Sequence, residues 1–593
     1  MKKNEINLES ESKTAQDQTI LNKIKDFQEI LTTSMDCFIQ KMKQDGENIE
    51  DQLVIKKLIQ DNLDKLFETM ILIHASASNE NFFPSLTDLE KFSAKLRDEQ
   101  RTLNLELILE NFKLINEKLY IGKKKQEYLA KGIKLRVWRS FPKSIITTFG
   151  KFAYNRKALI PATKKDTTSL ENLTKEKMIF PIDEFLGADK LPFKISADAM
   201  LEIAYRVQEV PSYEAAWRAI KRSTLIDVNE DTVRAVANHI GSIVFENDEK
   251  NAMQAWETLQ SGKTRFPKTK RNHELYIEVD GSMLQTRKRL DENEKNIENQ
   301  EPTRNSLDEN EKPDHVASLP IAETCVDLSD HVDKTAKPNW TENQLGMVFS
   351  SDNFKWRRNN EGQLVPEIGK REYICYLGES SGFKKHLFAA AIKNGYGGYE
   401  KTILISDGAT WIRAMKEELF PDAQQILNIY HLCEKVSLFS KDIFHNDENM
   451  AKQWANNICD LLRQSEWETA VKEIISLGEA KKSKSKINLV EYILNNKDAI
   501  DYAYYKEQGW HVGGGAIENA DKTVLQSRLR QAGMRWNRDS GQFILSLTSK
   551  ALSNLWDEQV VKPIRNLYDV EGAASFLSSS ILYELLFHDK VNS

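Results

Sequence analysis

Two short stretches of the sequence share one pattern, an apolar strand that ends in Asp-Gly. The first reads ELYIEVDGSM over residues 274–283, and the second reads TILISDGATW over residues 402–411. The apolar runs are typical of buried strands, and the glycine after each acid relaxes the limits on the backbone. Asp-Gly is also a common turn dipeptide, so one copy alone indicates only a turn. The second copy predicts two strand ends that place Asp280 and Asp407 in one site.

The length and composition of the chain favour a multidomain globular protein. Its 593 residues exceed the size at which a single core stops growing. Hydrophobic residues make up 40% and charged residues 29%, which is ordinary for a soluble protein. The absence of an apolar run near about eighteen residues and of a signal-peptide pattern favours a cytoplasmic protein without a membrane segment. The five scattered cysteines form no CxxC pair and are expected to be free thiols.

Changes in sequence texture predict five regions. Amphipathic spacing over residues 1–130 predicts a helical N-terminal region. The other predicted regions are a hairpin and linker (131–195), a helix-turn-helix domain (196–265), an α/β core (270–560) and a C-terminal helical tail (561–593).

The helix-turn-helix prediction comes from three short helical patterns. Asn229 is expected to cap the last helix and Gly241 to stop it. This helix would offer Arg234, Asn238 and His239 outward, where they reach base edges or phosphates in a major groove. An ordinary three-helix bundle with a solvated polar face fits the same pattern.

The core prediction includes two interruptions. Residues 288–338 contain DENEKNIENQEPTRNSLDENEKPDH, which is too poor in apolar residues to order itself and is expected to be a disordered acidic insert. Residues 434–505 have helical spacing and predict a helical insertion. Strand-like and helical stretches otherwise alternate, which indicates an α/β core. A phosphate-binding loop is absent, so we expect no nucleotide cofactor.

The segment HVGGGAIENADKTVLQSRLRQAGMRWNRDSGQFILSL, residues 511–547, holds a third acid. Three glycines lead into a helix whose first turn contains Glu518. The helix dipole also favours an acid there, and Lys522 lies four residues on, as in an ordinary surface pair. The basic residues that follow suit either a solvated face or DNA-backbone contacts with stacking on a base. The candidate DNA-binding residues of this block are Lys522, Arg528, Arg530, Arg535 and Trp536.

This order of motifs is similar to that of the DDE transposases of bacterial insertion sequences. The resemblance covers about residues 135–556 and is nearest to the ISKra type, with the ISLre type related. It implies an RNase H-like core in which Asp280, Asp407 and Glu518 are the catalytic and metal-binding acids. Two Mg²⁺ or Mn²⁺ ions about 3.5–4 Å apart would then serve phosphodiester chemistry. The three-helix segment occupies the place of a helix-turn-helix.

Two positions depart from the family pattern. Relatives commonly have Asp-x-x-His after the second catalytic acid, whereas this chain has Asn428 and His431. His431 is a secondary candidate for the site, oriented by Asn428, and a structural histidine is the alternative reading. The acidic insert and the lack of upstream cysteine pairs are further differences.

The resemblance implies a transposase that acts on DNA in the bacterial cytoplasm. It would bind the terminal repeats of its element as a homo-oligomer, cleave double-stranded DNA at the element ends, and join the freed 3′-hydroxyls to target DNA. A metal-dependent nuclease of the same fold would use the same three acids. A non-catalytic DNA-binding protein derived from a transposase is the other alternative.

Overall fold

The computed structural model describes residue 90 and residues 121–162, 178–286, 339–358, 364–445, 447–477, 488–531 and 534–568. These belong to two compact units. The first comprises residues 1–199, 224–227 and 565–593, and the second comprises residues 200–223 and 228–564. The predicted acidic insert lies outside the described residues. So do the predicted N-terminal helical region, except for residue 90 and helix α4, and most of the C-terminal tail, of which helix α20 is described.

The first unit contains the predicted hairpin. Its elements are α4 (Ile121–Ala130), β1 (Leu135–Thr147), β2 (Gly150–Pro161) and α5 (Pro181–Phe185), and α20 (Lys562–Tyr568) begins at its boundary. Strands β1 and β2 pair antiparallel. The buried carboxylate of Asp183 on α5 accepts hydrogen bonds from Tyr154 Oη at 2.7 Å and from Lys143 Nζ at 3.0 Å. These bonds attach α5 to the hairpin.

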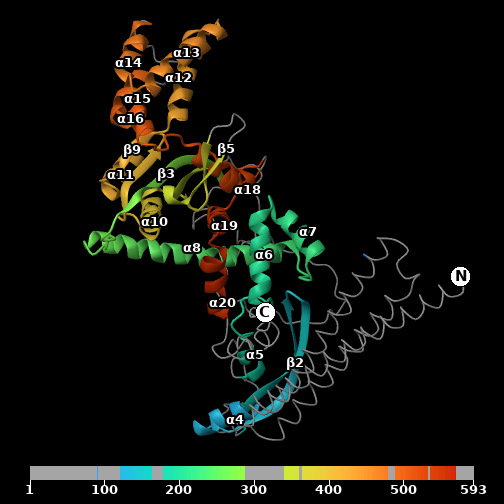
Figure 1. The fold of residues 1–593 in the computed structure, drawn as a ribbon. Helices are drawn as coiled ribbons and strands as arrows, with labels where there is room; N and C mark the ends of the chain where they lie inside the picture. Colours follow the sequence, from blue (N-terminus) through green and yellow to red (C-terminus); the bar gives the residue numbers. More distant parts are fainter. Residues whose placement is uncertain are drawn as a thin grey trace, which may run out of the picture. The chain divides into compact units, whose positions relative to one another are not determined.

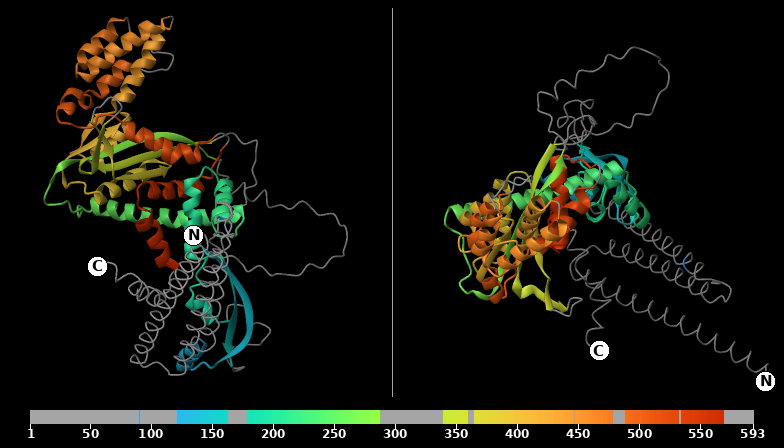
Figure 2. Two further views of the ribbon diagram at one scale, coloured as in Figure 1. Left: turned by 45° about the vertical axis from the view of Figure 1, so that its right-hand side comes forward. Right: turned by 90° about the horizontal axis from the view of Figure 1, so that it is seen from above.

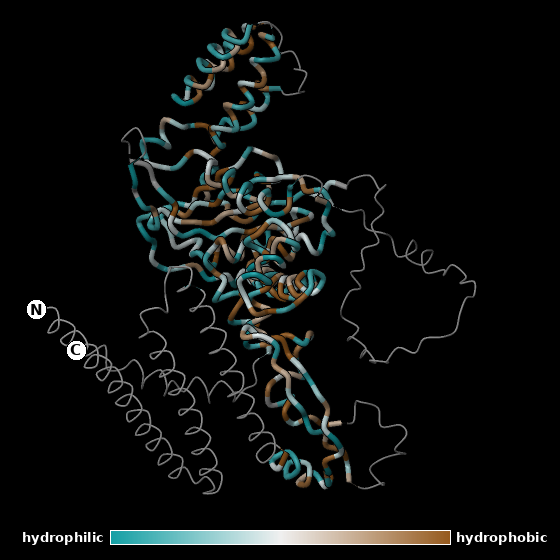
Figure 3. The backbone as a smooth tube through the Cα atoms, turned by 90° about the vertical axis from the view of Figure 1, so that its right-hand side faces the viewer, coloured by the Kyte–Doolittle hydropathy of each residue, from teal (hydrophilic) through white to brown (hydrophobic). Residues whose placement is uncertain are grey.

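The second unit is built on a five-stranded mixed sheet in the order β7-β4-β3-β8-β9. Its strands are β3 (Arg271–Thr286), β4 (Asn339–Ser350), β7 (Arg371–Leu377), β8 (Tyr399–Ser406) and β9 (Gln424–Leu427). Strand β4 runs antiparallel to β3 and β7, whereas β8 runs parallel to β3 and β9. Apolar residues are concentrated in these strands (Figure 3). The predicted α/β core is therefore confirmed. A separate hairpin, β5 (Phe354–Arg358) and β6 (Leu364–Ile368), was not predicted.

Helices cover both faces of this sheet (Figures 1 and 2). Helices α10 (Ser380–Lys393) and α11 (Thr410–Leu419) contribute to the apolar core on one face, where Ile277, Phe383 and Leu387 are fully buried. Each such side chain stabilises the fold by about 1.5–3 kcal/mol. Helices α17 (Gly515–Ala520) and α19 (Arg538–Leu552) contact β3 and β7 respectively on the other face.

The predicted three-helix segment consists of α6 (Ala197–Glu209), α7 (Tyr213–Ser223) and α8 (Glu230–Gln260). Asn229 caps α8 as predicted, because its side chain accepts from Thr232 N at 2.8 Å. The prediction that Gly241 stops this helix is wrong, since α8 is 31 residues long and continues past Gly241 to Gln260. Gly241 instead allows α8 to approach α19: a Cβ there would lie 2.6 Å from the Cβ of Phe543. None of the helices that the structure describes, α8 included, is long and apolar enough to cross a membrane.

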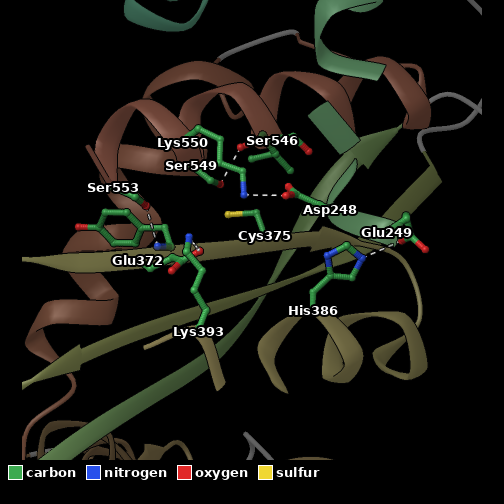
Figure 4. Close-up of polar contacts among 12 residues, drawn as sticks. Asp248, Glu249, Glu372, Cys375, His386, Lys393, Ser546, Ser549, Lys550 and Ser553 are labelled. Carbon is green, nitrogen blue, oxygen red and sulfur yellow. Dashed lines mark hydrogen bonds and ion pairs between the residues drawn. The ribbon is translucent and has the colours of Figure 1, made fainter. Parts of the chain in front are cut away.

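Polar contacts attach α8 to its neighbours (Figure 4). Lys550 Nζ on α19 lies 2.8 Å from Asp248 Oδ1, and both side chains are largely buried. His386 Nε2 on α10 lies 2.7 Å from Glu249 Oε1. These two pairs fix the central part of α8 against helices from both faces of the sheet.

The segment predicted as a helical insertion consists of helices where the structure describes it. It follows β9 directly and comprises α12 (Ile429–Ile443), α13 (Glu448–Arg463), α14 (Trp467–Ser476), α15 (Leu489–Asn495) and α16 (Tyr502–Glu507), which lie together in Figure 1. After it, the helix that starts at Gly515 has an irregular middle. Residues Asp521–Gln526 form a π-helical turn between α17 and α18 (Ser527–Leu529). Such turns are rare and frequently occur at functional sites.

Candidate active site

The register of the sheet places the two Asp-Gly motifs side by side. Val279 on β3 pairs with Ser406 on β8, and Ser406 in turn pairs with the last residue of β9. The next residues are Asp280, Asp407 and Asn428. Asp407 and Asn428 directly follow the ends of β8 and β9, but the prediction that a strand ends at Asp280 is wrong, because β3 stays paired with β4 as far as Thr286. The register nevertheless brings Asp280 level with the carboxyl ends of β8 and β9, so the three residues lie together there.

Asp407 is fixed by contacts on both sides of its backbone. Its Oδ1 accepts from Ala409 N at 2.9 Å, and its carbonyl oxygen accepts from Tyr492 Oη at 2.6 Å. Gly408 has φ +81°, a conformation that glycine adopts without strain. The hydrogen bond from Ala409 N sets the direction of the Asp407 carboxylate.

Glu518 reaches the same edge from α17. Its Oε1 accepts from Asn428 Nδ2 at 3.2 Å, so its hydrogen-bond partner is Asn428 and not Lys522. The Asn428 Oδ1 accepts from Gly514 N at 2.9 Å, and a Cβ at Gly514 would collide with the Asn428 amide. Asn428 therefore orients Glu518 and the backbone at Gly514, whereas the prediction was that it orients His431.

One small pocket gathers all five predicted site residues. Its volume is about 30 Å³, which suits ions and water molecules better than an organic cofactor. The residues that line it are Val279, Asp280, Ile405, Ser406, Asp407, Asn428, His431, Gly514, Ile517 and Glu518. His431 Nδ1 lies 3.6 Å from Glu434 Oε2, one turn further along α12.

The electrostatics of the pocket favour a cation. The pKa of Asp280 is raised to about 6, mainly by burial; the negative charges of Asp407, Asp521 and Glu518 act in the same direction, and the Gly281 N–H acts against them. Three carboxylates with no cation between them repel one another. Among the described residues, no group of three or more Asp, Glu, His or Cys side chains lies at metal-ligand spacing.

The donor set fits a hard divalent ion. Carboxylate oxygens are the ligands that Mg²⁺ and Mn²⁺ prefer, and a cation would offset the charge that raises the pKa of Asp280. Asp280, Asp407 and Glu518 are the residues that would hold such ions.

Metal binding is therefore expected to depend on pH. Because the raised pKa leaves Asp280 protonated below about pH 6, a metal ion must displace that proton at lower pH. The dissociation constant for Mn²⁺, measured by calorimetry, should rise roughly tenfold per pH unit below 6 and stay level above it. Asp280→Asn should bind Mn²⁺ weakly with no such break near pH 6. Equal wild-type affinity at pH 5 and pH 7.5 would contradict the assignment.

Two predicted DNA-binding residues are instead structural. Arg528 is 2% exposed, and its Nε and Nη1 donate to the carbonyl oxygens of Val207 at 3.0 Å and Pro211 at 2.7 Å. Trp536 is 8% exposed and donates from Nε1 to Leu529 O at 3.1 Å. The prediction that these side chains face DNA is wrong, because both fill the interface between the α6–α7 segment and the helices after α17.

The prediction that α8 points Arg234, Asn238 and His239 outward is also partly wrong. Asn238 is 5% exposed, so it cannot reach a groove from this position. His239 is half-buried, and burial lowers its pKa. Arg234 is accessible, but its guanidinium lies over the Tyr213 ring and 3.5 Å from Glu230 Oε1.

Three of the predicted basic residues remain at the surface. Lys522, Arg530 and Arg535 are exposed, on the π-helical turn and the segment that follows it. Arg530 Nη1 lies 3.8 Å from Asp521 Oδ2.

Sequence reasoning missed two acids near the site. Glu278 lies two residues before Asp280 and is fully buried, and burial raises its pKa to about 8. Asp521, three residues after Glu518, is 9% exposed, and its charge contributes to the raised pKa of Asp280. An acid inside an apolar strand was a visible signal for Glu278, because charged residues are rarely buried without a role.

Comparison with protein-family models gives no match for this chain, and a search of curated proteins gives no match either.

Proposed function

We propose that this chain is a metal-dependent polynucleotidyl transferase, specifically the transposase of a bacterial insertion sequence. The observation that carries the proposal is the convergence of Asp280, Asp407 and Glu518 on one small pocket from β3, β8 and α17. Hard carboxylates in an open pocket suit phosphodiester cleavage and transfer, for which divalent metal ions activate the attacking oxygen and stabilise the leaving oxygen.

The sheet topology supports an RNase H-like core. From β3 the chain passes to one side of the sheet with β4 and β7, and then to the other side with β8 and β9. The strand order thus reverses between β3 and β8. In open α/β sheets, ligands bind at the carboxyl ends of the two strands where the order reverses. A central strand with the first acid and a neighbouring parallel strand with the second is the arrangement that the family resemblance implies.

The five predicted site residues of the pocket each have a task in this proposal. Asp280 within β3 and Asp407 directly after β8 would hold the ions, and Glu518 would complete the ligand set from the helix. Asn428 fixes the Glu518 carboxylate by its hydrogen bond, so the asparagine at this position serves the site instead of weakening it. His431, on the pocket wall, would donate to a phosphate oxygen of the DNA.

The DNA itself would be held by other parts of the chain. The α6–α8 segment, with Arg234 accessible, is the proposed helix-turn-helix. A homo-oligomer would hold both element ends together, as the joining reaction requires. In this proposal the protein works on DNA in the bacterial cytoplasm.

The direct test requires the inverted repeats that a transposase gene of this kind would have at its flanks. Purified protein with Mg²⁺ or Mn²⁺ should cut a terminal-repeat duplex at the element end and join the 3′-hydroxyl to a target plasmid. Cutting without joining would favour a nuclease of the same fold. Binding to the repeats without any cutting would favour a non-catalytic DNA-binding protein.

The exposed basic residues give a separate prediction about DNA affinity. Changing Lys522, Arg530 and Arg535 together to Gln should weaken binding to all DNA sequences alike. The slope of log affinity against log salt should flatten by up to about 0.9 for each phosphate that the variant no longer neutralises. The measurement is fluorescence anisotropy over a salt series. The matched control changes the exposed Lys452, Lys472 and Lys506 of the helical insertion to Gln. An unchanged slope in the first variant would show that its basic face is merely solvated.

A further inference from the structure

Glu278 has no role in the chemistry described so far, yet it is the most deeply buried acid near the pocket. It lies on β3 two residues before Asp280, so both side chains project from the same face of the sheet. Its exposure is 0%. A buried carboxyl group is costly to keep unless its hydrogen bonds serve a purpose.

The contacts of Glu278 lead to the other side of the pocket. Its Oε2 accepts from the backbone N–H of Ile517 at 3.0 Å, across 239 residues of sequence. Ile517 lies directly before Glu518 on α17. The Glu278 Oε1 has no hydrogen-bond partner among the described residues, and His511 Nε2 lies 3.7 Å from it.

A second residue of β3 holds the start of the same segment. Tyr276 Oη accepts from His511 N at 3.1 Å. Tyr276, Glu278 and Asp280 are alternate residues of one strand, so they share one face. Two side chains of β3 therefore hold the two ends of the glycine turn, which we define as residues 511–517. The third acid, Glu518, directly follows this turn.

This turn has little stability of its own. Residues 513–515 are three consecutive glycines, which lose more conformational entropy on ordering than other residues. Helix α17 continues into the π-helical turn and is also held by its buried Ile517 and Ala520 side chains. The bonds from Glu278 and Asn428 fix its first turn and the glycines before it.

We infer that Glu278 is a positioning residue that sets the place of Glu518 relative to Asp280 by holding the Ile517 amide to the strand that carries Asp280. This inference rests on the proposed function. If so, strand β3 sets the distance between the Asp280 and Glu518 carboxylates, because it carries Asp280 and also holds the helix that carries Glu518. The two acids are far apart in the sequence.

The test compares Glu278→Met with Glu278→Gln. Methionine has a similar volume and no acceptor, so the fold should survive while the Ile517 amide loses its partner. Glutamine keeps an acceptor oxygen and should rescue the function. Glu278→Met should raise the Mg²⁺ concentration for half-maximal cleavage at least tenfold and lower the rate roughly a hundredfold, as expected for a misplaced catalytic group. Glu278→Gln should stay within about threefold of wild type on both counts, since its bond to Ile517 is kept.

Two further readouts do not depend on cleavage. Hydrogen exchange at the Ile517 amide should be slow in wild type and Glu278→Gln and fast in Glu278→Met. The Mn²⁺ dissociation constant without DNA should rise at least tenfold in Glu278→Met alone. The matched control is Glu372→Met, which removes another buried acid of the sheet, bonded to Lys393 and Asn394 (Figure 4), and should leave metal affinity unchanged.

The outcomes separate the two proposals. A wild-type protein that neither binds Mn²⁺ nor cuts terminal-repeat DNA would end the proposed function, and the inference with it. Wild-type metal affinity and rate in a folded Glu278→Met would overturn the inference alone. So would a Glu278→Gln variant as impaired as Glu278→Met, since the acceptor would then not be what matters.

Discussion

Changing any one of Asp280, Asp407 and Glu518 to its amide is expected to abolish Mg²⁺-dependent cleavage and joining. An amide nearly preserves shape but removes a charged ligand from a pocket that all three residues line. Metal ions contribute several kcal/mol to phosphodiester chemistry, so each change should lower the rate at least about a thousandfold. Binding to terminal-repeat DNA should survive, because none of the three carboxylates attracts a phosphate backbone. Rates on a labelled duplex and anisotropy on the same duplex measure the two effects.

The losses should not add. Residues that act as one unit cannot be removed twice, so the protein with both Asp280→Asn and Asp407→Asn should match either single variant. Asp422→Asn, an exposed acid in the turn before β9, is the control and should keep full activity. If Asp407 serves only its turn, Asp407→Asn should stay near wild type, since asparagine suits such turns equally well. That result would end the metal-site assignment.

Changing Arg528 to Ala is expected to destabilise the second unit by about 3 kcal/mol, since hydrogen bonds from a charged donor contribute about 1.5–3 kcal/mol each. Its guanidinium accounts for two such bonds to carbonyls at the end of α6 and lies about 5 Å from the ring centroids of Tyr213 and Trp536. Burial lowers its pKa to about 10, so it stays charged at neutral pH, and the cost of burying that charge limits the net gain. Urea unfolding followed by tryptophan fluorescence measures the change.

Two comparisons isolate the cause. Arg530→Ala, at an accessible position two residues on, should change stability by no more than about 0.5 kcal/mol. Arg528→Lys should recover only part of the loss, because lysine lacks the planar fork that reaches two carbonyls. An Arg528→Ala protein with wild-type stability and a flatter salt dependence of DNA binding would instead support the phosphate contact that the sequence suggested.

The sequence was most informative where local pattern and geometry agree. The strand that ends before Asp407 could be predicted because an apolar run followed by Asp-Gly indicates both a strand and its end. The same pattern at Asp280 indicated the strand but not its end, because pairing with β4 continues to Thr286. Their pairing follows once the two strands are parallel neighbours. Glu518 could be placed only by its motif, since nothing in its own helix shows which strand it faces.

The predictions failed where the environment of a residue depends on a segment that packs against it from elsewhere in the sequence. Helical spacing shows that α8 is a helix, but only the packing of α19 against Gly241 explains why it continues past that glycine. Asn238 and Arg528 are polar residues in polar-looking patterns, and their burial depends on segments distant in the sequence. Glu278 was visible as an acid in an apolar strand, but its partner, the Ile517 amide, was not predictable from spacing.

The π-helical turn at Asp521–Gln526 has a consequence for how this chain tolerates insertions and deletions. Glu518 upstream of it must face the pocket, while Arg528 downstream must face the end of α6. An α-helix advances by about 100° per residue, whereas a π-helical turn spreads nearly the same rotation over one residue more. Deleting one residue there would let an unbroken α-helix form, and the faces of the two halves would keep nearly the same relative direction. The π-helical turn thus takes up one extra residue without changing where Glu518 and Arg528 point, and a single-residue deletion would be tolerated better here than in the regular helix on either side.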